Sequence, residues 1–472
     1  APIAYGDWRD VYRERWVWDK VVRSSHWVNC WYQAHCAWNV YVKDGMVWRE
    51  EQAADYPQTR PDVPDYNPRG CQKGACFSER MYDDARVKYP LKRVGERGSG
   101  KWQRIPWDQA LSEIADSMID TIVEEGSDRV IWDLGPGVSL GTQMAGQGRL
   151  RILLDSTSLD MNTEIGDGHR GAAETFGKIV FERSADDYFF SDLILCWGAN
   201  PSYTQIPNAH FLTEARYKGA EFICITPDYS ATARHADRWI PVKPGGDAAL
   251  ALGVAHILFA ENLVDRAFVA EQTDLPMLVR DDTHRFLRAE DLEEGGSEDA
   301  LYLHDPETGI VPAPTRSLAL AGLNPSLEGR FEVTLRDGKK VGVRPVFELL
   351  REQLAIYTPE HAAELSGTPA PQIRDLAHRL ARAKAASMVT TSNFAKYYHG
   401  NLIERAQALV FALTGNFGKK GSGFVGFPFL VHDGLEGFVL SMFDLPVRML
   451  IQGSRLVDEA RLRYAGYTDE MI

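Results

Sequence analysis

The sequence predicts an α/β protein with mostly parallel sheets of the doubly wound type. Two observations point to this fold class. Short apolar runs of strand length alternate with longer segments whose apolar residues recur at helical spacing, and each run ends in a loop that contains glycine or proline. Strands separated by helices are joined by right-handed crossovers, so neighbouring strands are expected to be parallel. The length of 472 residues suggests about three domains or lobes.

The regular α/β pattern begins after residue 105. Apolar spacing predicts a helix over residues 107–125 that ends at Gly126, where the missing β-carbon suits a carboxyl-terminal cap. Strands are expected at residues 129–134, 192–197, 221–225 and 238–242. The carboxyl ends of parallel strands gather bare backbone amides and helix amino termini, so four such loops predict a large dinucleotide-like cofactor along the sheet edge. No Gly-x-Gly-x-x-Gly follows a strand, which disfavours an ordinary NAD fold.

Residues 277–345 interrupt this pattern, because they are rich in charge, glycine and proline. They predict an inserted surface subdomain that contains a β-hairpin over residues 331–343 with an Asp-Gly turn. The α/β pattern then resumes, with a helix at 372–383, a strand at 386–391, a helix at 402–413 and a glycine-dense loop at 414–423. The predicted domains are residues 1–105, residues 106–276, the insert 277–345 and a second α/β portion, 346–472.

Composition excludes some classes of function. A formal net charge of −14 argues against a nucleic-acid surface, because phosphates require clustered Lys and Arg. No run of about 18 apolar residues is present, so no membrane span is expected. Ala1 is not an initiator Met, and we expect a processed chain whose export signal has been removed. Small molecules and other proteins are the expected partners.

Four potential soft ligands occur in the order His26, Cys30, Cys36 and Cys71. Thiolates and an imidazole can each hold one iron of an iron-sulfur cluster, and zinc in a Cys3His site is the alternative. Spacing alone leaves Cys76 or His35 as substitutes for His26. Cys196 and Cys224 lie inside apolar runs, where a free cysteine behaves as a small buried hydrophobe.

The chain also resembles the catalytic alpha subunits of the dimethyl sulfoxide reductase superfamily of molybdenum enzymes, and more closely their amino-terminal half. Its nearest resemblance is to the branch with respiratory nitrate reductase, selenate, chlorate and perchlorate reductases, dimethyl sulfide dehydrogenase and ethylbenzene dehydrogenase. The motifs are spread over residues 8 to 425; they are residues 25–36, 47–52, 67–74, 89–95, 209–219 and 395–400. The family's last domain, which closes the pterin site, is expected to be absent from these residues.

The resemblance implies roles for individual residues. His26, Cys30, Cys36 and Cys71 match the ligands of one [4Fe-4S] cluster, which decides against zinc, Cys76 and His35. Lys73 matches the basic residue between the cluster and the pterin, and Asp167 matches the aspartate that ligates molybdenum. Lys396 and His169 are candidate pocket residues, because a cation can bind an oxyanion or stabilise a developing charge. The residues that resemble pterin-nucleotide contacts are Trp197, Gly198, Asn200, Thr226, Asp228, Gly246 and Asp247.

The implied cofactors are Mo-bis(molybdopterin guanine dinucleotide) and the [4Fe-4S] cluster. The implied reaction is two-electron oxygen-atom transfer in the periplasm, with electrons passing through the cluster to an iron-sulfur beta subunit and a haem b gamma subunit. Residues 136–138 replace a histidine of ethylbenzene dehydrogenase by Pro-Gly-Val, which favours the dimethyl sulfide dehydrogenase, selenate reductase or chlorate reductase type. The alternatives are an anaerobic hydrocarbon or steroid hydroxylase and a non-catalytic electron-transfer subunit, although Asp167 argues against the latter.

Overall fold

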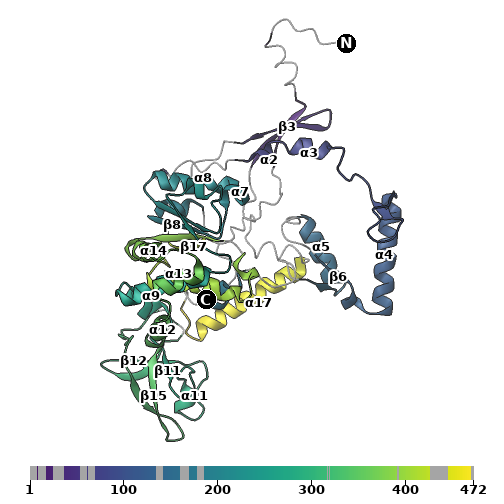
Figure 1. Ribbon diagram of the computed structural model, residues 1–472. Coiled ribbons are helices and arrows are strands. Elements are labelled where there is room, and N and C mark those ends of the chain that lie inside the picture. Colours follow the sequence, from purple (N-terminus) through teal and green to yellow (C-terminus); the bar gives the residue numbers. More distant parts are fainter. Residues whose placement is uncertain are drawn as a thin grey trace, which may run out of the picture. The chain divides into compact units, whose positions relative to one another are not determined.

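The computed structural model describes Trp8 and residues 18–24, 37–53, 61, 70–133, 142–159, 169–177, 185–315, 317, 319–390, 393–425 and 445–468 (Figure 1). The chain divides into two compact units. The first unit contains Ala1–Gly166, Pro201–His210 and Pro428–Phe443, and the second contains Asp167–Asn200, Phe211–Phe427 and Asp444–Ile472.

A three-stranded antiparallel sheet opens the first unit. Its strands are β1 (Lys20–Ser24), β2 (Trp38–Lys43) and β3 (Met46–Gln52), in that order. Asp44 and Gly45 join β2 to β3, and both have positive φ, of 51° and 76°. Two residues with positive φ make the tight turn that matches the twist of a hairpin. The short helices α2 (Gln72–Ala75) and α3 (Phe77–Tyr82) follow, and both lie against β3.

The remainder of the first unit contains the predicted first helix and first strand. The helix is confirmed as α4 (Trp107–Glu124), which follows the short pair β4 (Leu91–Arg93) and β5 (Trp102–Arg104). The strand expected at 129–134 is reduced to β6 (Ile131–Trp132) after the 3-10 turn η1 (Ser127–Arg129). It pairs in parallel with β7 (Thr157–Ser158), beyond helix α5 (Thr142–Leu153), and does not join the main sheet. The expectation that four strand ends share one edge was therefore wrong for this strand, whose Ile131 side chain is exposed.

The main sheet lies in the second unit and has five strands that are all parallel. Their order is β10 (Arg238–Pro241), β9 (Glu221–Thr226), β8 (Leu193–Trp197), β16 (Ala386–Val389) and β17 (Gly423–Val425). Four of these strands were predicted, with ends that agree within two residues. The mixed fold with a parallel sheet is thus confirmed, and antiparallel pairing is found in several of the smaller sheets.

Apolar helices build the core around this sheet (Figure 1). Helix α9 (Asp247–Ala260) is largely buried. It contacts α12 (Val346–Leu354), α13 (Pro359–Ser366), α14 (Ala370–Arg382) and α15 (Gly400–Leu413). All five residues of β8 and all four of β16 are buried. Each fully buried aliphatic side chain stabilises the fold by about 1.5–3 kcal/mol, so these central strands form a firm base for the loops at their ends.

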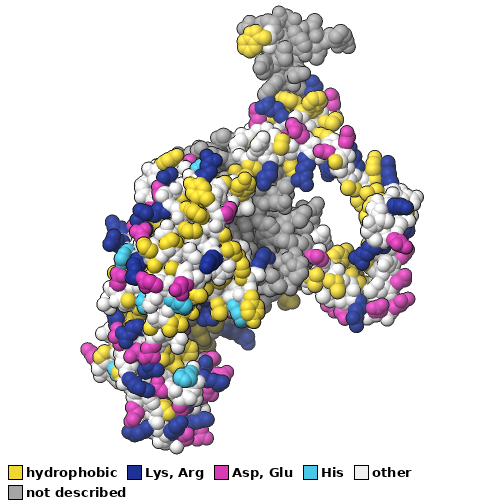
Figure 2. Space-filling model, in the orientation of Figure 1, with side chains coloured by type: hydrophobic (Ala, Val, Ile, Leu, Met, Phe, Trp, Pro, Cys, Tyr) yellow, Lys and Arg dark blue, Asp and Glu magenta, His cyan; other side chains and the backbone are white. Residues whose placement is uncertain are grey.

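The segment predicted as an insert forms its own small sheet of β11 (Leu278–Arg280), β15 (Lys340–Pro345) and β14 (Phe331–Thr334), with the separate pair β12 (Tyr302–Asp305) and β13 (Gly309–Pro312). The predicted hairpin is confirmed, since Thr334 pairs with Lys340 and Gly338 has a φ of 85°. The insert has a separate apolar core, which includes Leu278, Leu335 and Val343. Charges of both signs cover it, as the lower part of Figure 2 shows.

Further helices are α6 (Arg170–Phe176), α7 (Pro201–Thr204), α8 (Ile206–Tyr217), α10 (Arg266–Gln272), α11 (Ala289–Leu292) and α17 (Leu445–Tyr464). The sequence did not predict α17. Within the described ranges, no helix has the length and apolar content that crossing a bilayer requires.

Candidate functional site

The chain stretches that lead to the predicted cluster ligands meet in the first unit. Strand β1 ends at Ser24, two residues before His26, and β2 begins at Trp38, two residues after Cys36. Ser24 and Trp38 are paired directly across the two strands. His26, Cys30 and Cys36 themselves lie outside the described residues. The pairing therefore places the entry to this segment beside its exit.

The stretch before Cys71 joins the same place through Gln52. The side-chain oxygen of Gln52 accepts a hydrogen bond from the backbone N–H of Gly70, and its amide group donates to the carbonyl of Ala37 at 3.4 Å. A β-carbon on Gly70 would lie 2.3 Å from the Trp38 ring, so only glycine allows this approach. Gln52 thus links the residue after Cys36 to the residue before Cys71.

Cys71 is 7% exposed, is not in a disulfide, and stands immediately before α2. Lys73 is exposed on α2, and the Cys76 thiol donates to the Lys73 carbonyl at 3.7 Å. Within the described part of the chain, no group of three His, Cys, Asp or Glu residues forms a metal site. The assignment of four cluster ligands and Lys73 stays a prediction.

A second group of predicted residues meets at the carboxyl edge of the parallel sheet, in the second unit. Gly198 follows β8 with a φ of 66°, and its N–H donates to the carbonyl of Ile225 on β9 at 3.0 Å. A β-carbon on Gly198 would lie 2.3 Å from the ring of Phe394, which is buried in the loop after β16. Glycine therefore permits close contact between the loops of two neighbouring strands that are far apart in sequence.

Two predicted residues of this edge form a buried pair. The side chain of Trp197 has no exposed surface, and its indole N–H donates to the carboxylate of Asp247 at 2.9 Å. Burial raises the pKa of the Asp247 carboxyl to about 6, although the bond from Trp197 favours the charged form. Gly246 precedes Asp247 at the start of α9, and a β-carbon there would lie 2.9 Å from the backbone of Ser366. The edge thus carries a carboxyl group that changes its charge near neutral pH.

The loops after β8 and β9 are joined by side-chain hydrogen bonds. The Thr232 hydroxyl donates to the side-chain oxygen of Asn200 at 2.6 Å. The Thr226 hydroxyl donates to the carbonyl of Asp228 at 2.8 Å, and the Trp239 indole N–H donates to the carbonyl of Thr226 at 3.1 Å. Thr226 is buried, whereas the Asp228 side chain is exposed. The structure brings these predicted contacts to one edge, and their roles stay predictions.

The loop after β16 carries Lys396, which is exposed. The next residue, Tyr397, lies 3.8 Å from the position that a β-carbon would take on Gly245, in the loop after β10. Loops after β8, β9, β10 and β16 therefore all contribute to the same edge.

His169, a predicted pocket residue, lies at the start of α6, and its role stays a prediction. It is 2% exposed and has a left-handed backbone, with a φ of 51°, at the start of α6. Its Nδ1 lies 3.0 Å from Oε1 of Glu404, a buried residue of α15. Asp167, the predicted molybdenum ligand, lies outside the described residues.

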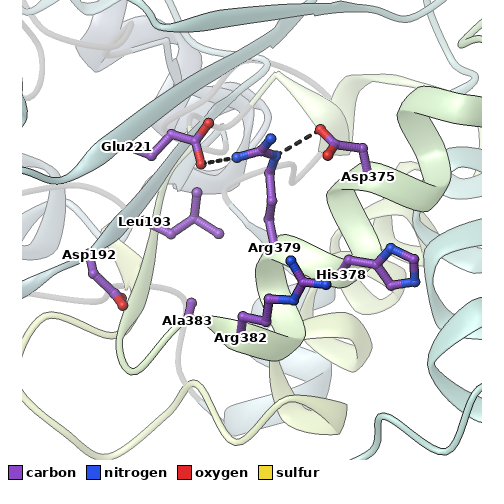
Figure 3. A pocket seen from close by; sticks show the side chains of 8 residues that line it. All are labelled: Asp192, Leu193, Glu221, Asp375, His378, Arg379, Arg382 and Ala383. Atoms are coloured by element: carbon purple, nitrogen blue, oxygen red, sulfur yellow. Dashed lines mark hydrogen bonds and ion pairs between the residues drawn. The ribbon is translucent and has the colours of Figure 1, made fainter.

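A recess at the opposite, amino-terminal edge of the sheet contains an ion-pair network and none of the predicted residues (Figure 3). Arg379 donates to Glu221 and to Asp375, the latter at 2.7 Å. Asp192 accepts from the backbone N–H groups of Lys384 and Ala385 at 3.0 and 2.9 Å. Arg379 thus joins α14 to β9, and Asp192 joins the chain just before β8 to the chain just before β16, so the network has a structural role.

Sequence reasoning missed Phe394, Gln52 and Glu404. Gln52 was part of a quoted motif without an assigned role, and Phe394 and Glu404 lie in a loop and a helix where nothing local distinguishes them. Only the folded contacts mark these residues.

Comparisons with known proteins identify the family of this chain. The profile of the family described as Molybdopterin oxidoreductase matches residues 86–454. The alpha subunit of dimethylsulfide dehydrogenase from Rhodovulum sulfidophilum is 42% identical over 88% of this chain and 46% of its own length. The alpha subunits of perchlorate reductase from Dechloromonas aromatica and chlorate reductase from Ideonella dechloratans are each 40% identical, over 89% of this chain and 48% and 45% of their lengths. The chain thus spans just under half of these relatives.

Among solved structures, acetylene hydratase from Pelobacter acetylenicus has a similar fold, with a TM-score of 0.54 and 22% sequence identity. The match covers 84% of this chain and 44% of that one.

Proposed function

The chain belongs to the molybdopterin oxidoreductase family, and we propose that it is part of the catalytic alpha subunit of a molybdenum-dependent oxidoreductase. We propose two-electron oxygen-atom transfer of the dimethyl sulfide dehydrogenase, selenate reductase or chlorate reductase type. Relatives that act on dimethyl sulfide, perchlorate and chlorate by their names support this class of small substrate.

The meeting of Gly198 with Phe394 is the observation that carries the proposal. It joins the loops after β8 and β16, the two strands at which the strand order reverses: β9 and β10 lie on one side, and β17 lies on the other. This order supports the inference that the sheet is of the doubly wound type, in which ligands bind beside the carboxyl ends of the strands at the reversal. A dinucleotide cofactor is therefore proposed at this edge, where the loops after β8 and β16 lie beside each other.

The proposed cofactor is Mo-bis(molybdopterin guanine dinucleotide), which supplies the metal that exchanges oxygen and two electrons with the substrate. Backbone groups at Gly198 and Gly246 would approach it, and Asn200, Thr226 and Asp228 would offer polar contacts. Trp197 is buried, so its role is to hold the carboxyl group of Asp247 at the start of α9. Asp247 can accept hydrogen bonds from N–H donors of a nucleotide base.

We assign the molybdenum ligand to Asp167, because a carboxylate oxygen suits a high-valent metal. Lys396 is exposed at the proposed edge, where its cationic side chain can bind an anionic substrate group. We also propose His169 as a pocket residue, which the buried Glu404 of α15 holds through its Nδ1.

We also propose a [4Fe-4S] cluster held by His26, Cys30, Cys36 and Cys71, which passes the electrons to partner subunits, with Lys73 between cluster and pterin. The convergence of the chain before His26, after Cys36 and before Cys71 supports this ligand set. Alpha subunits imply partners, and we propose an iron-sulfur beta subunit and a haem b gamma subunit in the periplasm.

Metal analysis of the purified complex tests this proposal. This chain is expected to bind about one molybdenum and about four cluster irons. Asp167→Ala should abolish turnover of a panel of chlorate, selenate, nitrate and dimethyl sulfide, whereas Asp116→Ala, on the exposed surface of α4, should not. Iron without molybdenum would favour a non-catalytic electron-transfer subunit, and turnover of ethylbenzene alone would favour a hydrocarbon hydroxylase.

A further inference from the structure

Glu404 is a carboxylate buried between two helices. It lies on α15, is 3% exposed, and faces the start of α6. One oxygen accepts from the backbone N–H of Gly171 at 2.8 Å and of Ala172 at 3.3 Å, and the other lies 3.0 Å from Nδ1 of His169. The first N–H groups of a helix have no partner within the helix, so a buried helix start requires such an acceptor.

The two helices touch at a point where no side chain fits. A β-carbon on Gly171 would lie 2.2 Å from the carbonyl oxygen of Asn401 and 2.7 Å from the β-carbon of Glu404. One turn further along α6, the Asn401 amide donates to Glu174 at 2.9 Å. Glu404 therefore holds the first turn of α6 on α15, and the contact is as tight as backbone packing allows.

Both helices begin a few residues after a proposed functional residue. Helix α6 begins three residues after Asp167, and α15 begins four residues after Lys396. Both helices begin after a histidine with a left-handed backbone, His169 with a φ of 51° and His399 with a φ of 56°. The proposed molybdenum ligand and Lys396 are thus each followed, within four residues, by a helix whose N-cap histidine has a left-handed backbone.

We propose that Glu404 is a positioning residue: by fixing the start of α6 on α15, it sets the place of His169, two residues after the proposed molybdenum ligand, relative to α15, which begins four residues after Lys396. This inference rests on the proposed function for the identity of the metal ligand. The contact itself depends only on described residues. A carboxylate that accepts from two backbone N–H groups and lies against a histidine nitrogen is held in one place, since buried polar networks rigidify when their members are satisfied.

The experiment compares three variants of the full complex: Glu404→Ala, Glu404→Gln and Glu174→Gln. The amide oxygen introduced by Glu404→Gln can still accept from the two backbone N–H groups, whereas alanine cannot. Glu174→Gln alters an exposed contact between the same helices, away from the start of α6. The readouts are molybdenum per chain, the Mo(V) electron paramagnetic resonance spectrum, and hydrogen exchange of residues 169–176.

We expect Glu404→Ala to raise exchange of the Gly171 and Ala172 amides at least tenfold and to lower molybdenum content severalfold. Glu404→Gln should fold, restore most of the exchange protection and shift the Mo(V) spectrum, and Glu174→Gln should match the wild type in all three readouts. If Glu404→Ala does not fold, the spectrum and exchange of Glu404→Gln decide. Wild-type values for both Glu404 variants would overturn the positioning role.

Failure of the proposed function has a different signature. If the wild-type complex contains no molybdenum, that proposal fails, and faster exchange of residues 171 and 172 in Glu404→Ala would show only that the residue supports α6.

Discussion

Asp247→Asn tests the electrostatics of the proposed cofactor edge. Asp247 is 4% exposed, and burial raises the pKa of its carboxyl from 3.8 to about 6. The folded state therefore holds a proton more tightly than the unfolded state. The group's contribution to stability is complete below pH 3.8 and is lost as the pH rises through 6. Asparagine cannot ionise, so the variant should not lose this stability.

The size of the effect follows from the two pKa values. A shift from 3.8 to about 6 corresponds to about 3 kcal/mol. Between pH 4 and pH 8 the variant should gain about 2–3 kcal/mol relative to the wild type, because part of the titration lies below pH 4. For a unit of roughly 280 residues, this gain corresponds to an increase in Tm of roughly 4 °C relative to the wild type.

The assay is thermal unfolding at pH 4 and pH 8 of both proteins, produced in a host that does not make the pterin. The side-chain oxygen that Asp247→Asn retains can still accept from the Trp197 indole, so the packing is kept. Equal differences in Tm at the two pH values would refute the argument that burial destabilises the charged form of Asp247.

Asp305→Asn is the matched control of opposite sign. Backbone N–H groups, first that of Asn324 and then that of Thr308, lower the pKa of Asp305 to about 2. The stability it contributes is present above the unfolded value of 3.8 and is lost as the pH falls through 2. This variant should therefore be destabilised at pH 8, with the difference shrinking as the pH falls.

Two further predictions concern close contacts. Gly198→Ala should destabilise the protein by about 2–4 kcal/mol in denaturant unfolding, because it strains a positive φ and displaces Phe394. Gly177→Ala is the control for backbone strain alone, because Gly177 has a φ of 75° and open space at its β-carbon. Equal losses of stability in the two variants would contradict the contact between Gly198 and Phe394. Gln52→Leu should lower the iron content of the complex by at least twofold, because the chain before Cys71 loses its link to Ala37. Gln103→Leu, at an exposed position, is the control. Equal iron contents in the two variants would show that the link is dispensable.

The central strands were predictable because the local sequence of each strand indicates its burial. Residues 193–197 and 222–225 are continuous apolar runs, as expected for strands covered on both faces. Residues 130–132 are also apolar, but Ile131 is exposed and its strand pairs with β7 instead. A short apolar run indicates that a strand can form there, but it does not indicate which strand it pairs with.

The same limit applies to the candidate site. The predicted parallel pairing indicated that residues 198, 226 and 246 share an edge, because parallel strands bring their carboxyl ends together. Glu404 could not be found in this way, because a glutamate in a helix is usually solvated, and its burial arises from the approach of α6, more than 220 residues earlier in the chain. Its interactions are long-range, and local patterns do not encode them.

The adjacency of β8 and β16 also orders events during synthesis. About 190 residues separate the end of β8 from the start of β16. At roughly 5–20 residues per second, the ribosome needs about 10–40 s to supply the missing neighbour. Throughout this interval β8, whose five side chains are all apolar, presents an edge of unpaired backbone N–H and C=O groups. The nascent chain should accordingly be most prone to aggregation, and most dependent on chaperones, until residue 389 has left the exit tunnel.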